Sequence, residues 1–185
     1  TLVESGRSLR NIAILYRSHF ISRSFEEVFI KQGIQYTIYS GIEFYKRKEI
    51  KDVLCYLRMI SNADDISFLR IVNLPKRNIG EKRITFLKDY SDKNNCSLYQ
   101  ALQNNLEEEI LAKTQAKAFL ALVEKYKAIY ENMKLSELLT NVLNDSGYEA
   151  LLRTNGEQER LDNLAELKQS IFEYERDAGE ECSLS

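Results

Sequence analysis

The apolar residues of this chain recur at helical spacing, three or four residues apart, from residue 41 almost to the end, and no convincing strand pattern occurs there. The only proline, Pro75, ends one of these helices, because proline disfavours helical geometry in the residue before it. This pattern predicts a mainly α chain with a helical domain over residues 41–185. The expected helices cover residues 48–61, 64–72, 81–91, 116–130, 138–143 and 164–174.

The first 40 residues have a different pattern. Residues 11–16 form a short apolar run with the β-branched content of a buried strand, and residues 35–39 form a second run. Between them, residues 20–29 recur at broadly helical spacing, and Gly33 lies where a helix is commonly terminated. This β-α-β order is typical of a parallel α/β sheet, so we expect residues 1–40 to be a small α/β piece.

The composition is that of a folded protein in the cytoplasm. The chain of 185 residues is 44% hydrophobic and 10% aromatic, which is enough for one ordinary domain or for a domain carrying a fragment of another. No apolar run approaches the roughly 18 residues of a membrane span, and the N-terminus has no apolar signal-peptide core. We therefore expect a cytoplasmic chain without a membrane partner.

The sequence lacks the patterns of several common catalytic and metal sites. Its three cysteines lie far apart and it has one histidine, which disfavours a disulfide framework or a zinc site. Neither nucleotide-binding glycine pattern, G-x-x-x-x-G-K-[ST] or G-x-G-x-x-G, occurs. Adjacent acids such as Asp64 and Asp65 point in different directions on a helix, and we interpret them as caps or solvated faces. We expect no catalytic residue, metal or cofactor in this chain.

Charge is distributed unevenly along the chain. Residues 1–90 hold 16 basic and 10 acidic side chains, whereas residues 91–185 hold 10 basic and 18 acidic ones. The overall charge of −2 therefore conceals a basic first half and an acidic second half. The first half is suited to face a polyanion, and the second half is not.

The segment 74–83 has the strongest character of a binding site. Pro75 fixes a turn, Asn78 or Gly80 can supply a left-handed residue, and the N-terminus of the next helix presents backbone N–H groups. Phosphate oxygens accept hydrogen bonds from such groups. The alternative interpretation is an ordinary corner between helices with solvent-exposed cations. The basic side chains of the segment are Lys76, Arg77, Lys82 and Arg83.

A second candidate lies at the end of the first expected strand, where Arg17, Ser18 and His19 follow one another. In parallel sheets, ligand contacts gather at the carboxyl ends of the strands, and all three side chains can donate to a phosphate. The alternative interpretation is a polar start to a loop.

A long series of residues follows the order of one known protein family. These residues are Ile12–Ser18, Ser22–Arg23, Glu26–Glu27, Tyr39–Gly41, Phe44–Asp52, Tyr56–Arg58, Asn62, Asp64–Asp65, Phe68, Arg70, Asn73 and Pro75–Gly80, then Ser97–Tyr99, Ser146–Tyr148 and Arg160–Leu164. In this order they resemble the UvrD/PcrA/Rep family of superfamily-1 DNA helicases. The match is dense over residues 11–83 and weaker beyond, where it resembles the helical insertion of that family.

The resemblance implies that the chain is a fragment of an ATP-dependent helicase that unwinds DNA 3′ to 5′ in repair or replication. Residues 1–40 would belong to its second RecA-like domain, called 2A, and residues 41–185 to its mobile helical 2B domain. The Walker motifs would lie upstream, so ATP and Mg²⁺ would be bound by the full-length parent. The expected partners are a single-strand/duplex DNA junction, the remaining domains 1A, 1B and 2A, and regulatory proteins.

The resemblance also assigns contacts. Arg17, with Ser18 and His19, would contact the single strand, although the family usually has asparagine where this chain has His19. The turn at 74–83 would be a helix-hairpin-helix-like element that holds duplex DNA, with Asn78-Ile79-Gly80 in place of the family's G-I-G. The residues assigned to duplex DNA are Lys76, Arg77, Asn78, Ile79, Gly80, Lys82 and Arg83.

Two roles for the fragment remain open from the sequence. One is a DNA-binding accessory module, which the basic turn favours. The other is a protein-interaction and autoregulatory module with little DNA affinity, which the acidic residues 91–185 favour. We expect no ATP hydrolysis by the 185 residues alone.

Overall fold

A computed structural model describes residues 6, 8–16, 21–38 and 44–178 of the chain. The chain divides into two compact units, residues 1–47 and residues 48–185. The domain boundary expected at residues 40 and 41 stays a prediction, because residues 39–43 lie outside the described part.

The described residues of the first unit include a regular helix, α1 (Ser22–Lys31), and the short 3₁₀ turns η1 (Leu9–Asn11) and η3 (Phe44–Lys46). Helix α1 ends as expected, because Gly33 adopts a left-handed backbone with φ of +66°. The amide of Gly33 donates to Ile30 O at 3.1 Å and that of Ile34 to Phe29 O at 2.8 Å, which together close the last turn.

Phe44 is the packing centre of the first unit, and its side chain is completely buried. The guanidinium groups of Arg23 and Arg47 lie 5.4 and 5.3 Å from the centre of its ring. The buried carboxylate of Glu26 accepts a hydrogen bond of 3.2 Å from Phe44 N and one of 3.2 Å from the hydroxyl of Tyr36. These contacts fasten η3 to α1.

The two strands expected in the first unit are not formed in its described residues. Residues 12–16 and 34–38 have no strand assignment, although Ile12 has an extended backbone with φ of −110° and ψ of 127°. The side chain of Leu15 is 95% exposed. A strand needs a neighbour to complete its hydrogen bonds, and no described segment pairs with either run. The expectation of a mainly α chain is confirmed, whereas the β-α-β piece is not.

In its described residues the second unit is built of helices joined by turns and short connections, and the helices expected from apolar spacing are present. Helices α5 and α8 were not expected. The elements are α2 (Lys48–Ser61), α3 (Asp65–Ile71), α4 (Glu81–Asn94), α5 (Leu98–Asn104), α6 (Ala116–Lys127), η4 (Tyr130–Asn132), α7 (Leu135–Asp145), α8 (Tyr148–Thr154) and α9 (Gln158–Ala178).

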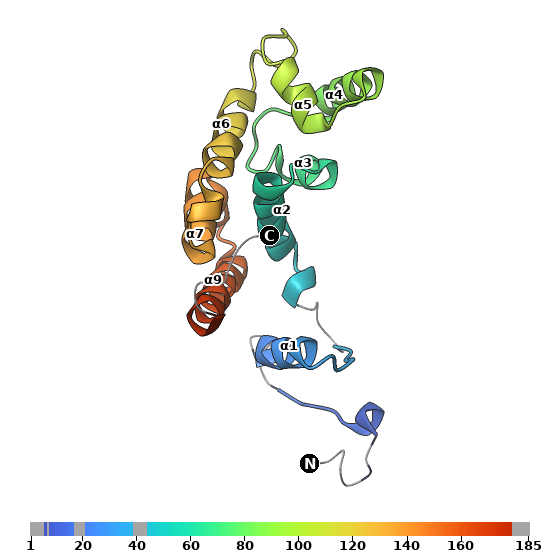
Figure 1. Ribbon diagram of the computed structural model, residues 1–185, viewed down its shortest axis with the longest axis vertical. Helices are drawn as coiled ribbons and strands as arrows, with labels where there is room; N and C mark the ends of the chain where they lie inside the picture. Colours follow the sequence, from blue (N-terminus) through green and yellow to red (C-terminus); the bar gives the residue numbers. More distant parts are fainter. Residues whose placement is uncertain (1–5, 7, 17–20, 39–43, 179–185) are drawn as a thin grey trace. The chain divides into compact units, whose positions relative to one another are not determined.

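Helix α2 is the central helix of this unit. It packs against α3, α6, α7 and α9, and Figure 1 shows it between α3 on one side and the α6–α7 column on the other. Its apolar residues Ile50, Val53 and Ile60 are at most 2% exposed, as their helical spacing predicts. Burying each of these side chains contributes about 1.5–3 kcal/mol to folding.

Two buried carboxylates on α2 connect it to distant helices. Asp52 accepts hydrogen bonds from the hydroxyl of Tyr148 at 2.8 Å and from Nε of Arg70 at 2.7 Å. Glu49 accepts one from Nδ2 of Asn163 at 2.6 Å. A buried charge is tolerated only with partners of this kind, so these contacts fix how α3, α8 and α9 dock on α2.

Side-chain caps mark the starts of α3 and α5. Asp64 caps α3 by accepting from Ser67 N at 2.9 Å, as expected for an acidic residue at a helix start. Asp65 accepts from Leu98 N, the first residue of α5, at 2.8 Å. Ser97 and Gln100 form a reciprocal capping box at the start of α5.

Candidate nucleic-acid interface

The connection between α3 and α4 is a tight turn whose shape is set by Asn73. Oδ1 of Asn73 accepts hydrogen bonds from Arg77 N at 2.8 Å and from Ile79 N at 3.1 Å. The Leu74–Pro75 peptide bond is cis, and Asn78 supplies the left-handed residue with φ of +61°. Of the two residues expected to take that conformation, Asn78 does so and Gly80 does not, since the φ of Gly80 is −86°.

The side chain of Arg77 is buried beneath this turn rather than exposed on it. The residue is 5% exposed, and Nη1 donates to Ile71 O and Leu74 O at 3.0 Å each. Nη2 donates to the hydroxyl of Tyr56 at 3.1 Å and to Ser146 O at 3.3 Å. The guanidinium group thus donates to carbonyl groups of two chain segments and to the hydroxyl of a third, a task suited to its fixed fork of donors.

Aromatic rings complete the surroundings of Arg77. Its guanidinium carbon lies 5.2 Å from the centre of the Phe119 ring. The hydroxyl of Tyr56 donates to Leu74 O while accepting from Arg77. Burial raises the pKa of Tyr56, and the positive charge of Arg77 opposes that shift. In this conformation Arg77 faces the core, as does Ile79, which is 1% exposed.

The other residues expected to bind duplex DNA lie at the surface. Lys76, Asn78, Gly80 and Lys82 are exposed, and Arg83 is half-buried. Gly80 is the N-cap of α4, and no side chain caps this end of the helix. The first turn of α4 therefore presents its backbone N–H groups beside exposed cations, which is the arrangement predicted from the sequence.

An open pocket of about 420 Å³ lies at this turn. Three of its lining residues carry a positive charge and none carries a negative one. Asn73 and Lys113 were not assigned to a site from the sequence, and Lys113 lies in a segment with no helical or strand pattern to predict its position. The lining residues are Asn73, Lys76, Asn78, Gly80, Arg83 and Lys113.

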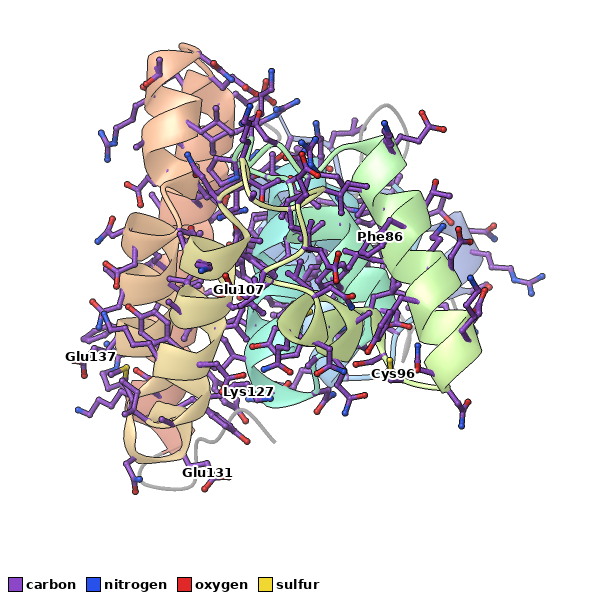
Figure 2. The ribbon with its side chains drawn as sticks, turned by 90° about the horizontal axis from the view of Figure 1, so that it is seen from above. Phe86, Cys96, Glu107, Lys127, Glu131 and Glu137 are labelled. Atoms are coloured by element: carbon purple, nitrogen blue, oxygen red, sulfur yellow. The ribbon has the colours of Figure 1, made fainter. Side chains whose placement is uncertain are left out.

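Some acidic residues of the second unit lie on a side away from α4 (Figure 2). Figure 2 shows Glu131 and Glu137 on the side of the unit away from Phe86 and Cys96, which belong to α4 and to the residues just after it. A second depression, of about 500 Å³, lies between α7 and α9. Its lining includes Glu137, Lys168 and Phe172, and the last of these is 55% exposed. Its mixed charge distinguishes it from the basic pocket.

The remaining site predictions are not tested by the geometry. Arg17, Ser18 and His19, assigned to the single strand, lie outside the described residues. Across residues 6, 8–16, 21–38 and 44–178, no group of three or more histidine, cysteine, aspartate or glutamate side chains is arranged to hold a metal ion. None of the helices in those ranges combines the length and apolar character needed to cross a membrane.

Comparison with known proteins gives one consistent result. Residues 1–184 match the model of the UvrD-like helicase C-terminal domain. The ATP-dependent DNA helicase PcrA of Staphylococcus epidermidis strain RP62A is 38% identical over 179 residues, which is 92% of this chain and 24% of that protein. PcrA of Bacillus subtilis strain 168 is 36% identical over 176 residues, with the same coverage. The chain thus spans about a quarter of the length of these curated relatives.

Proposed function

Because the chain belongs to the UvrD-like helicase C-terminal domain family, we propose that it is the duplex-holding part of an ATP-dependent 3′ to 5′ DNA helicase. Residues 74–83 hold the phosphate backbone of duplex DNA ahead of the fork. The observation that supports this most directly is the basic pocket at the turn, since three cations line it and no acidic side chain does. Such a surface binds phosphates without reading base sequence.

The residues of the turn have three roles. Lys76, Lys82 and Arg83 supply positive charge at the surface, while Asn78 and Gly80 shape the turn and the start of α4. The side chains of Arg77 and Ile79 hold the turn on the core, since both are buried. We therefore assign phosphate contact to the first group and support of the turn to the buried pair.

In the parent protein, residues 41–185 act as the helical 2B domain, and the first 40 residues belong to the RecA-like domain 2A. In this proposal, Arg17, Ser18 and His19 contact the single strand of DNA. ATP and Mg²⁺ bind at motifs outside this chain, and domains 1A, 1B and the remainder of 2A are its partners. The similarity to PcrA helicases over 92% of the chain supports this assignment.

The test is binding of the 185-residue chain to a duplex carrying a 3′ single-stranded tail, measured by fluorescence anisotropy over a salt series. Replacing Lys76 and Lys82 together by alanine should weaken binding and reduce the salt slope by about 0.9 for each phosphate that is no longer neutralised. Lys88→Ala combined with Lys93→Ala is the matched control, because it also removes two positive charges, both exposed on α4 and outside the pocket lining. Equal slopes for the wild type and the Lys76/Lys82 variant would falsify the assignment.

A second function is favoured by the acidic residues 91–185 and by the depression between α7 and α9. In this alternative the helical unit binds a regulatory protein or another helicase domain there, with Phe172 as its apolar contact. Phe172→Ala should then abolish capture of the partner helicase domains while leaving DNA binding unchanged. Capture that is unaffected by this substitution rules out the α7–α9 depression as the contact.

A further inference from the structure

We propose that Lys113 is a phosphate-binding residue, and that the basic pocket is a site for one DNA phosphodiester group built from two separate chain segments. The first segment is the turn at 74–83, and the second is the connection between α5 and α6, residues 105–115. This inference rests on the proposed function, because it extends the same DNA contact to a residue outside the turn.

Hydrogen bonds fasten the second segment to the turn on both sides of Lys113. Gln115 N donates to Arg77 O at 3.0 Å, and Nε of Arg83 donates to Ile110 O at 2.7 Å. Nδ2 of Asn78 donates to the carbonyl of Lys113 itself at 3.4 Å. The backbone of Lys113 is therefore held against the turn, which brings its side chain to the pocket although more than 30 residues separate it from Lys76.

The segment also has an internal structure that fixes the position of Lys113. Leu111 is 2% exposed and serves as its apolar anchor. Leu111 N donates to Glu108 O at 2.9 Å, and both the amide and the hydroxyl of Thr114 donate to Leu111 O, at 3.0 and 2.7 Å. These turns make residues 108–115 an ordered connection, so Lys113 extends from a fixed backbone.

The donors that line the pocket are available to a ligand. Lys76 and Lys113 are exposed and form no ion pair with a described residue. Arg83 uses Nε for Ile110 O, and its terminal nitrogens have no acceptor among the described residues. Oδ1 of Asn73 accepts from two backbone amides, so its Nδ2 is the atom left to donate.

The charge around the pocket selects an anion. Three formal positive charges meet there, and the acidic residues of the same segments, Glu81, Glu108 and Glu109, do not line it. The carboxylate of Glu107 forms an ion pair with Nζ of Lys117 at 2.7 Å, and neither residue lines the pocket. A phosphodiester is the anion that matches the proposed DNA contact, because a backbone phosphate accepts from lysine, arginine and amide donors together.

The experiment compares Lys113→Ala, Lys113→Arg and Lys117→Ala in the complete 185-residue chain. Lys117 is the matched control, because it lies four residues away, is exposed, does not line the pocket, and its replacement by alanine changes the net charge equally. Affinity for a tailed duplex is measured by anisotropy over a salt series, and thermal melts verify folding. We expect Lys113→Ala to weaken binding about fivefold at low salt and to lower the salt slope by about 0.9.

Each outcome has a definite meaning. A reduced slope for Lys113→Ala, restored by Lys113→Arg and absent in Lys117→Ala, supports the two-segment site. Equal reductions in the two alanine variants indicate a general charge effect and overturn it. A reduced slope for Lys76→Ala together with an unchanged slope for Lys113→Ala overturns this inference alone. If the salt slope is unchanged in Lys76→Ala and also in Lys113→Ala, the proposed DNA contact itself is rejected.

Discussion

Arg77 donates a hydrogen bond of 3.3 Å to the carbonyl oxygen of Ser146, which lies 69 residues further along the chain. The bond joins the turn between α3 and α4 to the corner between α7 and α8. A Cβ atom added at the neighbouring Gly147 would lie 3.8 Å from Cγ of Pro75, so the turn and the corner are also in packing contact. The position of the proposed DNA contact is thus tied to the middle of the helical unit.

The first prediction concerns this bond. Arg77→Lys keeps the positive charge but cannot reach the carbonyls of Ile71, Leu74 and Ser146 at once. Leaving buried acceptors unpaired should lower the free energy of unfolding by about 2–4 kcal/mol, whereas Lys76→Ala should change it by less than about 0.5 kcal/mol. Urea unfolding followed by circular dichroism measures both.

A DNA measurement on Arg77→Gln, which removes the positive charge, distinguishes two roles for the same residue. If Arg77 supports the turn, the substitution lowers DNA affinity through folding, and the salt slope of the remaining folded protein stays that of the wild type. A slope reduced by about 0.9 without any change in stability would instead make Arg77 a phosphate contact.

The second prediction concerns the left-handed backbone at Asn78, whose φ is +61°. Glycine adopts this conformation without a steric penalty. A residue with a Cβ atom is destabilised in it by about 1–2 kcal/mol, and asparagine is the least destabilised of these. Asn78→Gly should therefore keep or slightly raise the unfolding free energy, and Asn78→Ala should lower it by about 1 kcal/mol. Thermal denaturation of the two variants tests this order, and equal stability would show that the backbone at this position relaxes.

The third prediction concerns the buried pair of Tyr148 and Asp52. Burial raises the pKa of Tyr148, and the hydrogen bond to Asp52 raises it further, so the hydroxyl stays protonated and donates. Tyr148→Phe should lower the unfolding free energy by about 1–3 kcal/mol, because the carboxylate of Asp52 then keeps the bond from Arg70 but not the one from the tyrosine hydroxyl. Phe172→Ala is a suitable control, since that ring is 55% exposed.

The fourth prediction concerns acid stability. Hydrogen bonds from Lys125 and Tyr126 lower the pKa of Asp145 from its usual 3.8. The folded state therefore binds this proton less readily than the unfolded state, so the stabilisation is complete above pH 3.8 and is lost as the pH falls through the lower folded-state value. The stability difference between the wild type and Asp145→Asn should shrink over that interval in denaturation curves. A difference that is constant with pH would exclude the linkage.

Much of the helical unit could be predicted because its helices have long, regular apolar faces. Helix α2 has the limits that its spacing indicates, and α3 begins where the acidic pair indicates. Helices α5 and α8 have seven residues each, too few for a clear periodic pattern, and were missed. Helix α3 is equally short, but its acidic start and Pro75 marked its limits. The Ser97 and Gln100 capping box marks the start of α5 in the same way. The strands were expected from local composition, but a strand depends on partners that local composition does not supply.

The candidate site could be predicted only in part for a related reason. The sequence places cations in residues 74–83, and the left-handed Asn78 follows from its chemistry. Sequence does not show which cation is buried, and the burial of Arg77 depends on acceptors that α2 and the α7–α8 corner bring together. Lys113 was missed because only the tertiary fold brings residues 105–115 to the turn.

Asn73 gives the turn a property that its cations cannot provide. Its amide holds the backbone of Arg77 and Ile79 through neutral hydrogen bonds, which added salt hardly weakens. Lys76 and Lys113 at the rim of the pocket are exposed, and salt screens their charges strongly. The strength of the proposed attachment to DNA should therefore vary with ionic conditions while the surface keeps its shape, so that each release would leave the same surface ready for the next attachment.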